Sequence, residues 1–266
     1  MFPSQLVDYY LTHQQEFMGE DGHEKLLVGL KKYMMPLDTP VVGIDVGSCV
    51  GSYLPHLHAL CNEPHAQLLC FEPNPVNIAV LEPKLQGLPH VTLFKHCLSN
   101  ETTTASFYNW KFNTTNDAGN GIAGLRSGGE KLCDVDVKPL QDVVDRVCPD
   151  ATIKFIKIDT EGNDSNVLKG FVKYLPKTKY IIFECSDCLD DARGPGIPQP
   201  MKDVVDFLSL HGFDTYRIGT KKLFKVNDEY WHSTYEDVKF WSNCFSLQKG
   251  DPFIHHLIND HFDYTY

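Results

Sequence analysis

Three carboxylates follow one another in the stretch KFIKIDTEGND, residues 154–164, where an apolar run ends. They are Asp159, Glu161 and Asp164, and they come within six residues of chain. Carboxylates at the end of a strand can take a proton from a substrate hydroxyl, bind a divalent metal or cap the next helix. The stretch is therefore a candidate for acid–base chemistry, for metal binding or for a purely structural role.

A lysine lies inside the same apolar run. Ile156 and Ile158 alternate with Phe155 and Lys157, which is the two-residue period of a β-strand, and Lys157 is therefore predicted within the sheet layer. A buried lysine costs several kcal/mol unless an opposite charge is nearby. We expect it to pair with carboxylates at neighbouring strand ends, for which the candidates are Asp45, Asp159 and Glu184.

The structural alternative is that the acids cap the helix predicted at 166–175. We interpret Asp164 in this way, with Asn163 beside it. For Asp159 and Glu161 we favour contact with a substrate. A metal site is the weaker alternative, because no histidine or third carboxylate stands at a ligand spacing.

A second constellation is the stretch GIDVGSCVGS, in which Asp45, Gly47 and Gly51 follow an apolar run. Glycine permits a tight turn there, and the following helix is expected to present free amide groups to an anion. A dinucleotide fold would show G-x-G-x-x-G, whereas the glycines here are four residues apart. The spacing disfavours a pyrophosphate, although an ordinary strand-to-helix turn would look the same.

One further acid completes the predicted ligand site. Glu72 ends the run LLCFE, about 20 residues past the glycine turn, the position from which an acid binds ribose hydroxyls. The alternative is that Glu72 complements the dipole of the helix that begins near Pro73 and Pro75. We favour the ribose.

The elements that hold these residues alternate between strand and helix. Strands are predicted at 41–46, 67–72, 91–96, 153–159 and 179–184, with helices at 52–60, 76–86, 139–147 and 166–175. This alternation predicts an α/β fold with a mostly parallel sheet and helices on both faces. Residues 103–138 are predicted to form a β-hairpin insertion with a Gly/Asn-rich loop.

The remaining chain flanks this core. Residues 4–35 show helical spacing, and residues 201–266 suggest a helix, an antiparallel close and a C-terminal helix. We therefore predict an N-terminal helical cap at 1–38, one catalytic domain at 39–250 and a C-terminal helix at 251–266.

Composition limits the partners. The formal charge of −11 over 266 residues opposes attraction to nucleic acid or anionic lipid. No apolar run is long enough for a membrane span, and nine scattered cysteines suit a reducing compartment. We expect a cytoplasmic protein that does not bind membranes.

Five segments together carry a resemblance to a known family, and they span about residues 41–185. The segments are DVGSCVGSY, CFEPNP, CLSN, IKFIKIDTEGNDSNVLKG and IIFE. They resemble the FkbM family of S-adenosylmethionine-dependent methyltransferases, and the fourth is the most specific. The family commonly has Glu where Asp164 stands, so the role of that residue does not carry over.

The resemblance implies a class I methyltransferase (Rossmann-like) fold with S-adenosyl-L-methionine as cofactor, and members mostly methylate hydroxyls of sugars or natural products. The implied cofactor-binding residues are Asp45, Gly47, Ser48, Gly51, Glu72, Leu98, Ser99 and Asp159. Within that set, the resemblance implies that Leu98 and Ser99 lie by the adenine. Asp159 and Glu161 become catalytic candidates, and Glu161, Glu184 and Trp110 substrate candidates.

Two other classes of function stay open at this point. One is a cofactor-binding or interaction module that has lost its chemistry, against which the intact acids argue. The other is a nicotinamide-dependent oxidoreductase, which the glycine spacing opposes. The acceptor is expected to be a small molecule or carbohydrate, and no oligomeric state is predicted.

Overall fold

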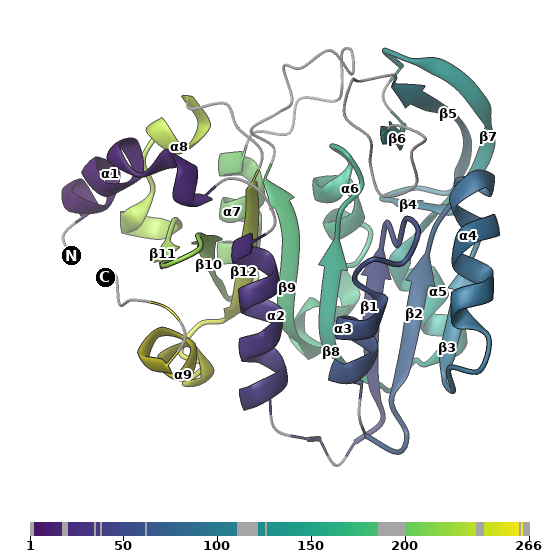
Figure 1. Cartoon of the computed structure of the whole chain (residues 1–266), viewed down its shortest axis with the longest axis horizontal. Coiled ribbons are helices and arrows are strands. Elements are labelled where there is room, and N and C mark those ends of the chain that lie inside the picture. Colours follow the sequence, from purple (N-terminus) through teal and green to yellow (C-terminus); the bar gives the residue numbers. More distant parts are fainter. Residues whose placement is uncertain are drawn as a thin grey trace. The chain divides into compact units, whose positions relative to one another are not determined.

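The structure is a computed structural model. It describes residues 3–17, 21–34, 36–37, 39–61, 63–110, 122–125, 127–185, 201–237, 242–260 and 262 (Figure 1). Among these, contacts divide the chain into two compact units. One is formed by residues within 36–178, and the other by residues within 3–34, 179–185 and 201–262.

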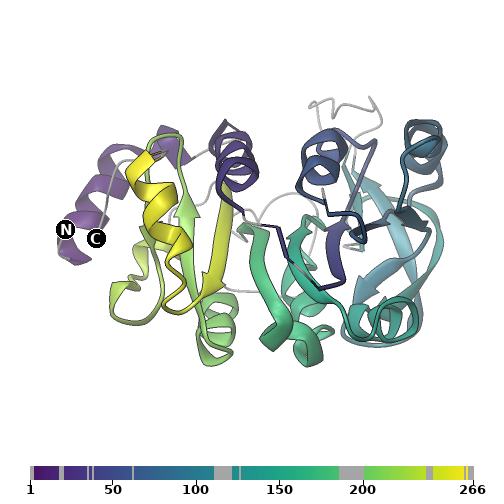
Figure 2. The ribbon, with the colours of Figure 1, turned by 90° about the horizontal axis from the view of Figure 1, so that it is seen from below.

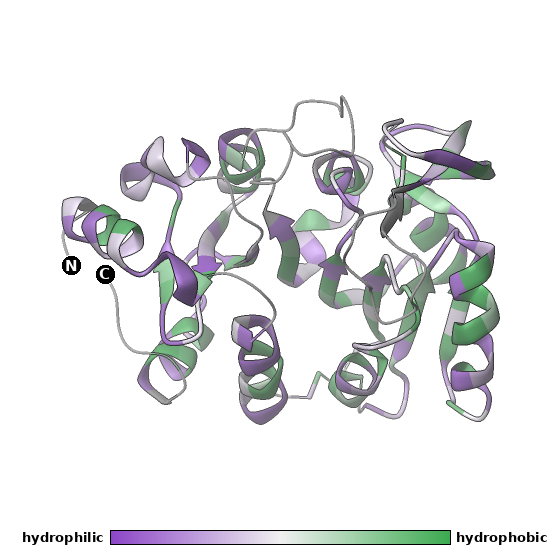
Figure 3. Cartoon of the chain, turned by 45° about the horizontal axis from the view of Figure 1, so that its top comes forward, coloured by the Kyte–Doolittle hydropathy of each residue, from purple (hydrophilic) through white to green (hydrophobic). Residues whose placement is uncertain are grey.

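A parallel sheet forms the centre of the 36–178 unit. Its strands lie in the order β3-β2-β1-β8, and every neighbouring pair is parallel. The strands are β1 (Val41–Val46), β2 (Gln67–Phe71), β3 (Val91–Phe94) and β8 (Thr152–Ile158). All six residues of β1 are buried, as expected of a strand that is covered on both faces. Figure 3 colours the chain by hydropathy and shows hydrophobic residues along the strands of the sheet.

Helices cover both faces of this sheet, with α3 and α4 on one face and α5 on the other (Figure 2). The helical segments are α3 (Leu54–Leu60), α4 (Pro75–Leu85), α5 (Leu140–Val147), α6 (Asp164–Lys169) and the 3₁₀ helix η2 (Val172–Lys177). Asn74 caps α4, because its Oδ1 accepts the Val76 amide at 3.0 Å.

Two predicted helices differ in the structure. The helix expected at 52–60 begins only at Leu54. The helix expected at 166–175 is two pieces, α6 and η2, separated at Gly170. A Cβ on Gly170 would lie 2.0 Å from the backbone oxygen of Ser99, and Pro176 inside η2 lacks the amide that an α-helix needs.

The predicted insertion is a second, smaller sheet in the order β4-β7-β5-β6. Its strands are β4 (Cys97–Ser99), β5 (Thr103–Trp110), β6 (Ile122–Gly124) and β7 (Glu130–Pro139). β5 and β7 form the expected antiparallel pair, and Phe107, Val135 and Val137 lie buried between them and β4. Most of the predicted Gly/Asn-rich loop lies outside the described residues.

The other unit has an antiparallel sheet in the order β9-β12-β10-β11. Its strands are β9 (Thr178–Cys185), β10 (Phe213–Ile218), β11 (Leu223–Lys225) and β12 (Ser242–Gln248). Its helices are α1 (Pro3–Thr12), η1 (Gln14–Phe17), α2 (Asp21–Tyr33), α7 (Met201–Leu210), η4 (Asp228–Tyr230), α8 (Thr234–Asp237) and α9 (Phe253–Asp260). A fully buried Arg217 joins its elements, because it donates to Tyr10 Oη at 2.6 Å and to Ser242 Oγ at 3.1 Å.

The parallel order β3-β2-β1-β8, with helices on both faces, confirms the predicted α/β, Rossmann-like fold. The predicted domain boundaries at 38/39 and 250/251 stay a prediction. No helix in the part of the chain that the structure describes is both long and apolar enough to span a membrane.

Candidate active site

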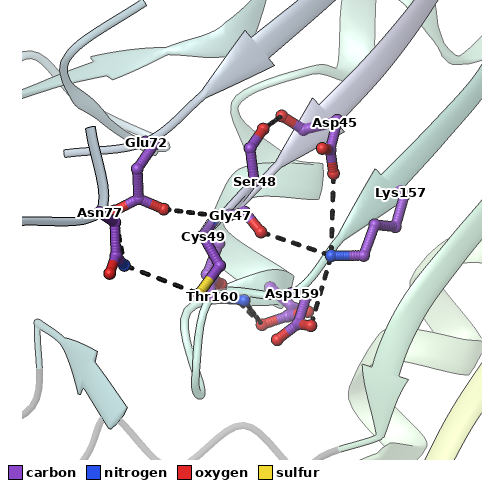
Figure 4. A network of polar contacts seen from close by, with 10 residues as sticks. Asp45, Gly47, Ser48, Cys49, Glu72, Asn77, Lys157, Asp159 and Thr160 are labelled. Atoms are coloured by element: carbon purple, nitrogen blue, oxygen red, sulfur yellow. Dashed lines mark hydrogen bonds and ion pairs between the residues drawn. The ribbon is translucent and has the colours of Figure 1, made fainter. Parts of the chain in front are cut away.

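The carboxyl ends of β1 and β8 bring opposite charges together. Asp45 and Lys157 are register partners across these parallel strands, so their side chains point the same way. Lys157 Nζ lies 3.7 Å from Asp45 Oδ1, 3.3 Å from Asp159 Oδ2 and 3.4 Å from the carbonyl oxygen of Gly47 (Figure 4). The prediction that Lys157 pairs with neighbouring carboxylates is therefore confirmed for Asp45 and Asp159.

The two carboxylates differ in their access to solvent. The side chain of Asp45 is 2% exposed and that of Lys157 is 4% exposed, whereas the side chain of Asp159 is 30% exposed. Burying Lys157 without a partner would cost several kcal/mol, so the pairs stabilise the ionised lysine. Asp159 is the member of this cluster that a ligand can reach.

The glycine turn after β1 closes against Asp159. Gly47 has φ +80°, and a Cβ placed on it would lie 1.8 Å from the carbonyl oxygen of Asp159. Only glycine fits, because any side chain would meet both a strained backbone and the neighbouring chain. The sequence requirement for glycine at this turn therefore comes from the close approach of the ends of β1 and β8.

Four amides of this turn donate within the protein, and the expectation that the following helix presents free amides to an anion stays a prediction. The amides of Gly47 and Ser48 both donate to the carbonyl oxygen of Phe71 at 3.0 Å, and the Cys49 amide donates to Glu72 Oε2 at 2.8 Å. The Gly51 amide donates to the Ser48 carbonyl oxygen at 2.8 Å. These contacts shape the turn and fix it to the end of β2.

Glu72 stands at the carboxyl end of β2, as predicted, and is only 4% exposed. Its Oε2 accepts the Cys49 amide, and its Oε1 accepts the Asn74 amide at 2.8 Å and Asn77 Nδ2 at 3.4 Å. Burial raises the pKa of Glu72 from 4.5 to about 7, against the opposing effect of these donors. A carboxylate has about four acceptor positions, so Oε2 keeps capacity for a further donor such as a hydroxyl.

Asn77 and Cys49 belong to this network although the sequence analysis did not select them. Asn77 Nδ2 donates to Glu72 and lies 3.7 Å from Cys49 Sγ. Burial, reinforced by the nearby Glu72, raises the pKa of the Cys49 thiol to about 11, so it is protonated at neutral pH. The available signal was the position of Asn77 in the first turn of α4, five residues after Glu72.

Ser48 and Gly51 make contacts within the protein. Ser48 is buried, and its hydroxyl donates to the Asp45 carbonyl oxygen at 3.2 Å. Gly51 has φ +81°, and a Cβ on it would lie 2.8 Å from a methyl group of Leu81 on α4. The predicted cofactor contacts of Ser48 and Gly51 stay predictions.

Leu98 and Ser99, in β4, are buried and lie against α6. Asn163 Nδ2 donates to the Leu98 carbonyl oxygen at 2.9 Å. Burial, and then the charge of Glu72, raise the pKa of the Cys97 thiol at the start of β4. A contact of Leu98 or Ser99 with a nucleobase stays a prediction.

The segment that carries Glu161 is a tight turn between β8 and α6. Thr160 donates to Asp164 Oδ2 through its amide at 3.2 Å and through its hydroxyl at 2.6 Å. Glu161 has φ +57°, a conformation that costs a non-glycine residue about 1–2 kcal/mol. Such strain recurs at functional sites, where the side chain rather than the backbone is needed.

The expected cap at α6 takes another form. Asn163 is the N-cap residue but makes no capping hydrogen bond with its side chain, and Asp164 is the first helical residue. The carboxylate of Asp164 closes the Thr160 turn, and its charge in the first turn of α6 suits the helix dipole. Asp164 is therefore structural, as interpreted from the sequence, but by a different contact.

Two substrate candidates are placed less fully. Glu184 lies in β9 of the other unit, is 7% exposed and is the register partner of Asn243. Trp110 ends β5 opposite Ile122, and its side chain lies outside what the structure describes. Their predicted contacts with a substrate stay predictions.

Within the described residues, no group of three or more histidine, cysteine, aspartate or glutamate side chains is arranged to hold a metal ion. The site is instead two linked sets of contacts at one sheet edge. One set is the Asp45–Lys157–Asp159 charge cluster, and the other is Glu72 with the amides of Cys49 and Asn74. In open α/β sheets this edge is where ligands bind.

Comparison with known proteins defines the family of this chain. A family model described as "Methyltransferase FkbM domain" matches residues 45–215, which is more than half of the chain. The matched region includes the glycine turn, Glu72 and the charge cluster. The chain therefore belongs to the FkbM family of methyltransferases, as its sequence segments predicted.

Individual relatives share less than a third of their aligned residues with this chain. "Methyltransferase sdnD" from Sordaria araneosa is 28% identical over 154 residues, which cover 48% of this chain and 59% of that protein. A solved methyltransferase FkbM from Methylobacillus flagellatus is 14% identical with a TM-score of 0.46, and the match covers 91% of this chain and 59% of that one. A SAM-dependent methyltransferase from Aquifex aeolicus is 16% identical with a TM-score of 0.42, over 93% of this chain and 99% of that one. The chain thus spans 59% of the length of the first two.

Proposed function

We propose that this protein transfers a methyl group from S-adenosyl-L-methionine to a hydroxyl of a sugar or other small molecule. One observation carries the proposal: Asp159, the accessible carboxylate of a buried charge cluster, adjoins the glycine turn at the ligand-binding edge of the sheet. The net charge of −11 favours such an acceptor over nucleic acid.

The residues present suit the cofactor. Glu72 retains acceptor capacity for ribose hydroxyls, and the buried side chain is held in place by the Cys49 and Asn74 amides. Gly47 leaves no side chain between the turn and Asp159. S-adenosyl-L-methionine is the methyl donor on which this family depends, and when bound it supplies a methyl group already activated on a sulfonium.

Because the donor is activated, the protein mainly has to align the acceptor. Positioning can contribute about 7–11 kcal/mol to lowering the barrier, whereas a general base contributes roughly 10²–10⁴-fold in rate. We infer that Asp159 or Glu161 accepts a hydrogen bond from the acceptor hydroxyl and so orients its lone pair. The same carboxylate receives the hydroxyl proton as the new carbon–oxygen bond forms.

The reaction balances without a further reactant. The sulfur–methyl bond breaks and its electron pair stays on sulfur, while the oxygen–methyl bond forms and the hydroxyl proton passes to the carboxylate and then to water. Lys157 Nζ lies 3.3 Å from Asp159 Oδ2 and so holds this carboxylate in position for the transfer. Asp45, which is buried, shares the charge of Lys157 without approaching the acceptor.

The proposal is tested with Asp159→Asn and Glu161→Gln, measured separately for cofactor binding by calorimetry and for turnover by transfer of a tritiated methyl group. The acceptor is first identified by mass spectrometry of the labelled product from fractionated extract. We expect cofactor binding to survive in Glu161→Gln, and turnover to fall by roughly 10²–10⁴-fold in whichever variant removes the base. Full turnover in both variants would refute the assignment of the base.

Cofactor binding without methyl transfer to any fraction would instead favour a non-catalytic module. Binding of a nicotinamide cofactor rather than S-adenosyl-L-methionine would favour an oxidoreductase. Calorimetry with both cofactors on the wild-type protein separates these two outcomes.

A further inference from the structure

Lys157 is a positive charge placed beside the proposed methyl donor, which is itself positively charged. Its ammonium lies within 3.7 Å of two carboxylates and 5.3 Å from the centre of the Tyr53 ring. It is only 3% exposed, so solvent screens it little. A lysine at this position is expected to weaken the binding of a cation, so its presence needs an explanation.

The net charge of the cluster provides an explanation for the presence of Lys157. Two carboxylates and one ammonium give Asp45, Lys157 and Asp159 a net charge of −1. S-adenosyl-L-methionine carries +1, because its amino and carboxylate groups cancel and the sulfonium remains. The product of methyl transfer has a neutral thioether at the same sulfur, and its net charge is zero.

We propose that the Asp45–Lys157–Asp159 cluster selects the cationic methyl donor against its neutral product, and that Lys157 sets how strong this selection is. The inference rests on the proposed function. With Lys157 present, the charge of −1 matches the donor, and the product loses this attraction as soon as the methyl group leaves. Lys157 is a positioning residue that also holds Asp159 toward the glycine turn (Figure 4).

Charge arithmetic fixes the direction of each change. Removing Lys157 leaves a charge of −2 and should increase the preference for the donor, whereas neutralising Asp159 leaves zero and should decrease it. At an effective dielectric constant of about 20, a unit charge about 12 Å from another changes relative affinity by roughly tenfold, and a nearer charge changes it by more. Glu72 is proposed to bind the ribose, a part that donor and product share.

The same strand offers a matched control. Lys154 is also in β8 and is 2% exposed, and its Nζ pairs with Glu63 Oε1 at 2.6 Å and donates to the Leu60 carbonyl oxygen. Three residues along a strand put it about 10 Å from Lys157. Lys154→Met should destabilise the fold much as Lys157→Met does, without changing the charge at the ligand edge.

The experiment measures dissociation constants of S-adenosyl-L-methionine and S-adenosylhomocysteine by calorimetry at pH 8.5. The ratio of the product constant to the donor constant is compared for wild type, Lys157→Met, Asp159→Asn and Lys154→Met. We expect the ratio to rise roughly tenfold in Lys157→Met, to fall roughly tenfold in Asp159→Asn and to stay at the wild-type value in Lys154→Met.

Each outcome decides between the two proposals. An unchanged ratio in Lys157→Met and Asp159→Asn, or a similar shift in Lys154→Met, would overturn the selection by this cluster. If wild-type protein binds neither ligand, the proposed function itself fails. Because the ratio compares two ligands on one protein, partial unfolding of a variant lowers both affinities and leaves the ratio unaffected.

Discussion

Replacing Glu72 with glutamine should separate stability from cofactor binding. Glu72 is 4% exposed, and burial raises its pKa from 4.5 to about 7. At pH values between 4.5 and about 7, Glu72 keeps its proton in the folded protein but has released it in the unfolded chain. Raising the pH through this window therefore lowers the free energy of unfolding of the wild type, and Glu72→Gln, which has no proton to lose, escapes this loss.

The magnitude follows from the width of the window. Each pH unit between 4.5 and about 7 changes the free energy of unfolding by about 1.4 kcal/mol, which makes a total of about 3 kcal/mol. Relative to wild type, Glu72→Gln should thus gain about 3 kcal/mol between pH 4.5 and pH 8. Glutamine keeps one acceptor oxygen, so its NH2 group must face either the Cys49 or the Asn74 amide, and this loss shifts the whole difference curve downward without changing its slope.

Urea denaturation from pH 4.5 to pH 8 measures this difference. Glu82→Gln is the control, because Glu82 lies on the same helix α4, is about half exposed and pairs with Lys95 at the surface. Its difference from wild type should stay flat. A flat curve for Glu72→Gln as well would refute the raised pKa, and undiminished binding of S-adenosyl-L-methionine by Glu72→Gln at pH 8 would refute the ribose contact.

Three further predictions concern the same site. Gly47→Ala should lower the free energy of unfolding by more than about 2 kcal/mol in urea, since its Cβ would lie 1.8 Å from the Asp159 carbonyl oxygen. The control is Gly87→Ala, because Gly87 has φ +83° but a Cβ there would have nothing within 4 Å, and this variant should lose only about 1 kcal/mol of unfolding free energy. Equal losses in the two variants would refute the effect of the contact between Gly47 and Asp159. Glu161→Gly should raise the free energy of unfolding by up to about 1 kcal/mol, because glycine adopts φ +57° without strain. The same variant should lose turnover, because the carboxylate is gone, and retained turnover would contradict the substrate role. Dialysis against EDTA should leave turnover unchanged, and a loss restored by Mg²⁺ would establish the metal alternative.

The local patterns of the sequence were sufficient for the elements of the core. Buried strands at 41–46 and 152–158 follow from apolar runs that are short and bounded by turn residues, and the Asn74–Pro75 pair marks the start of α4. The split of the helix expected at 166–175 was missed, because the cause is the backbone of Ser99, which is distant in sequence from Gly170. Helical periodicity alone contains no information about such a contact.

The sequence by itself determined the fold class, the family and the need of Lys157 for a counter-charge, because each depends on residue type and local spacing. Only the tertiary structure decided which carboxylates provide that charge and which one is accessible. Asp159 lies two residues after Lys157 in the chain, whereas the register of β1 on β8 brings the distant Asp45 to Lys157; of the two carboxylates, Asp159 is the more exposed. Only the structure likewise shows that the amides of Gly47, Ser48 and Cys49 donate to Phe71 and Glu72 at the end of β2, because these partners are distant in sequence.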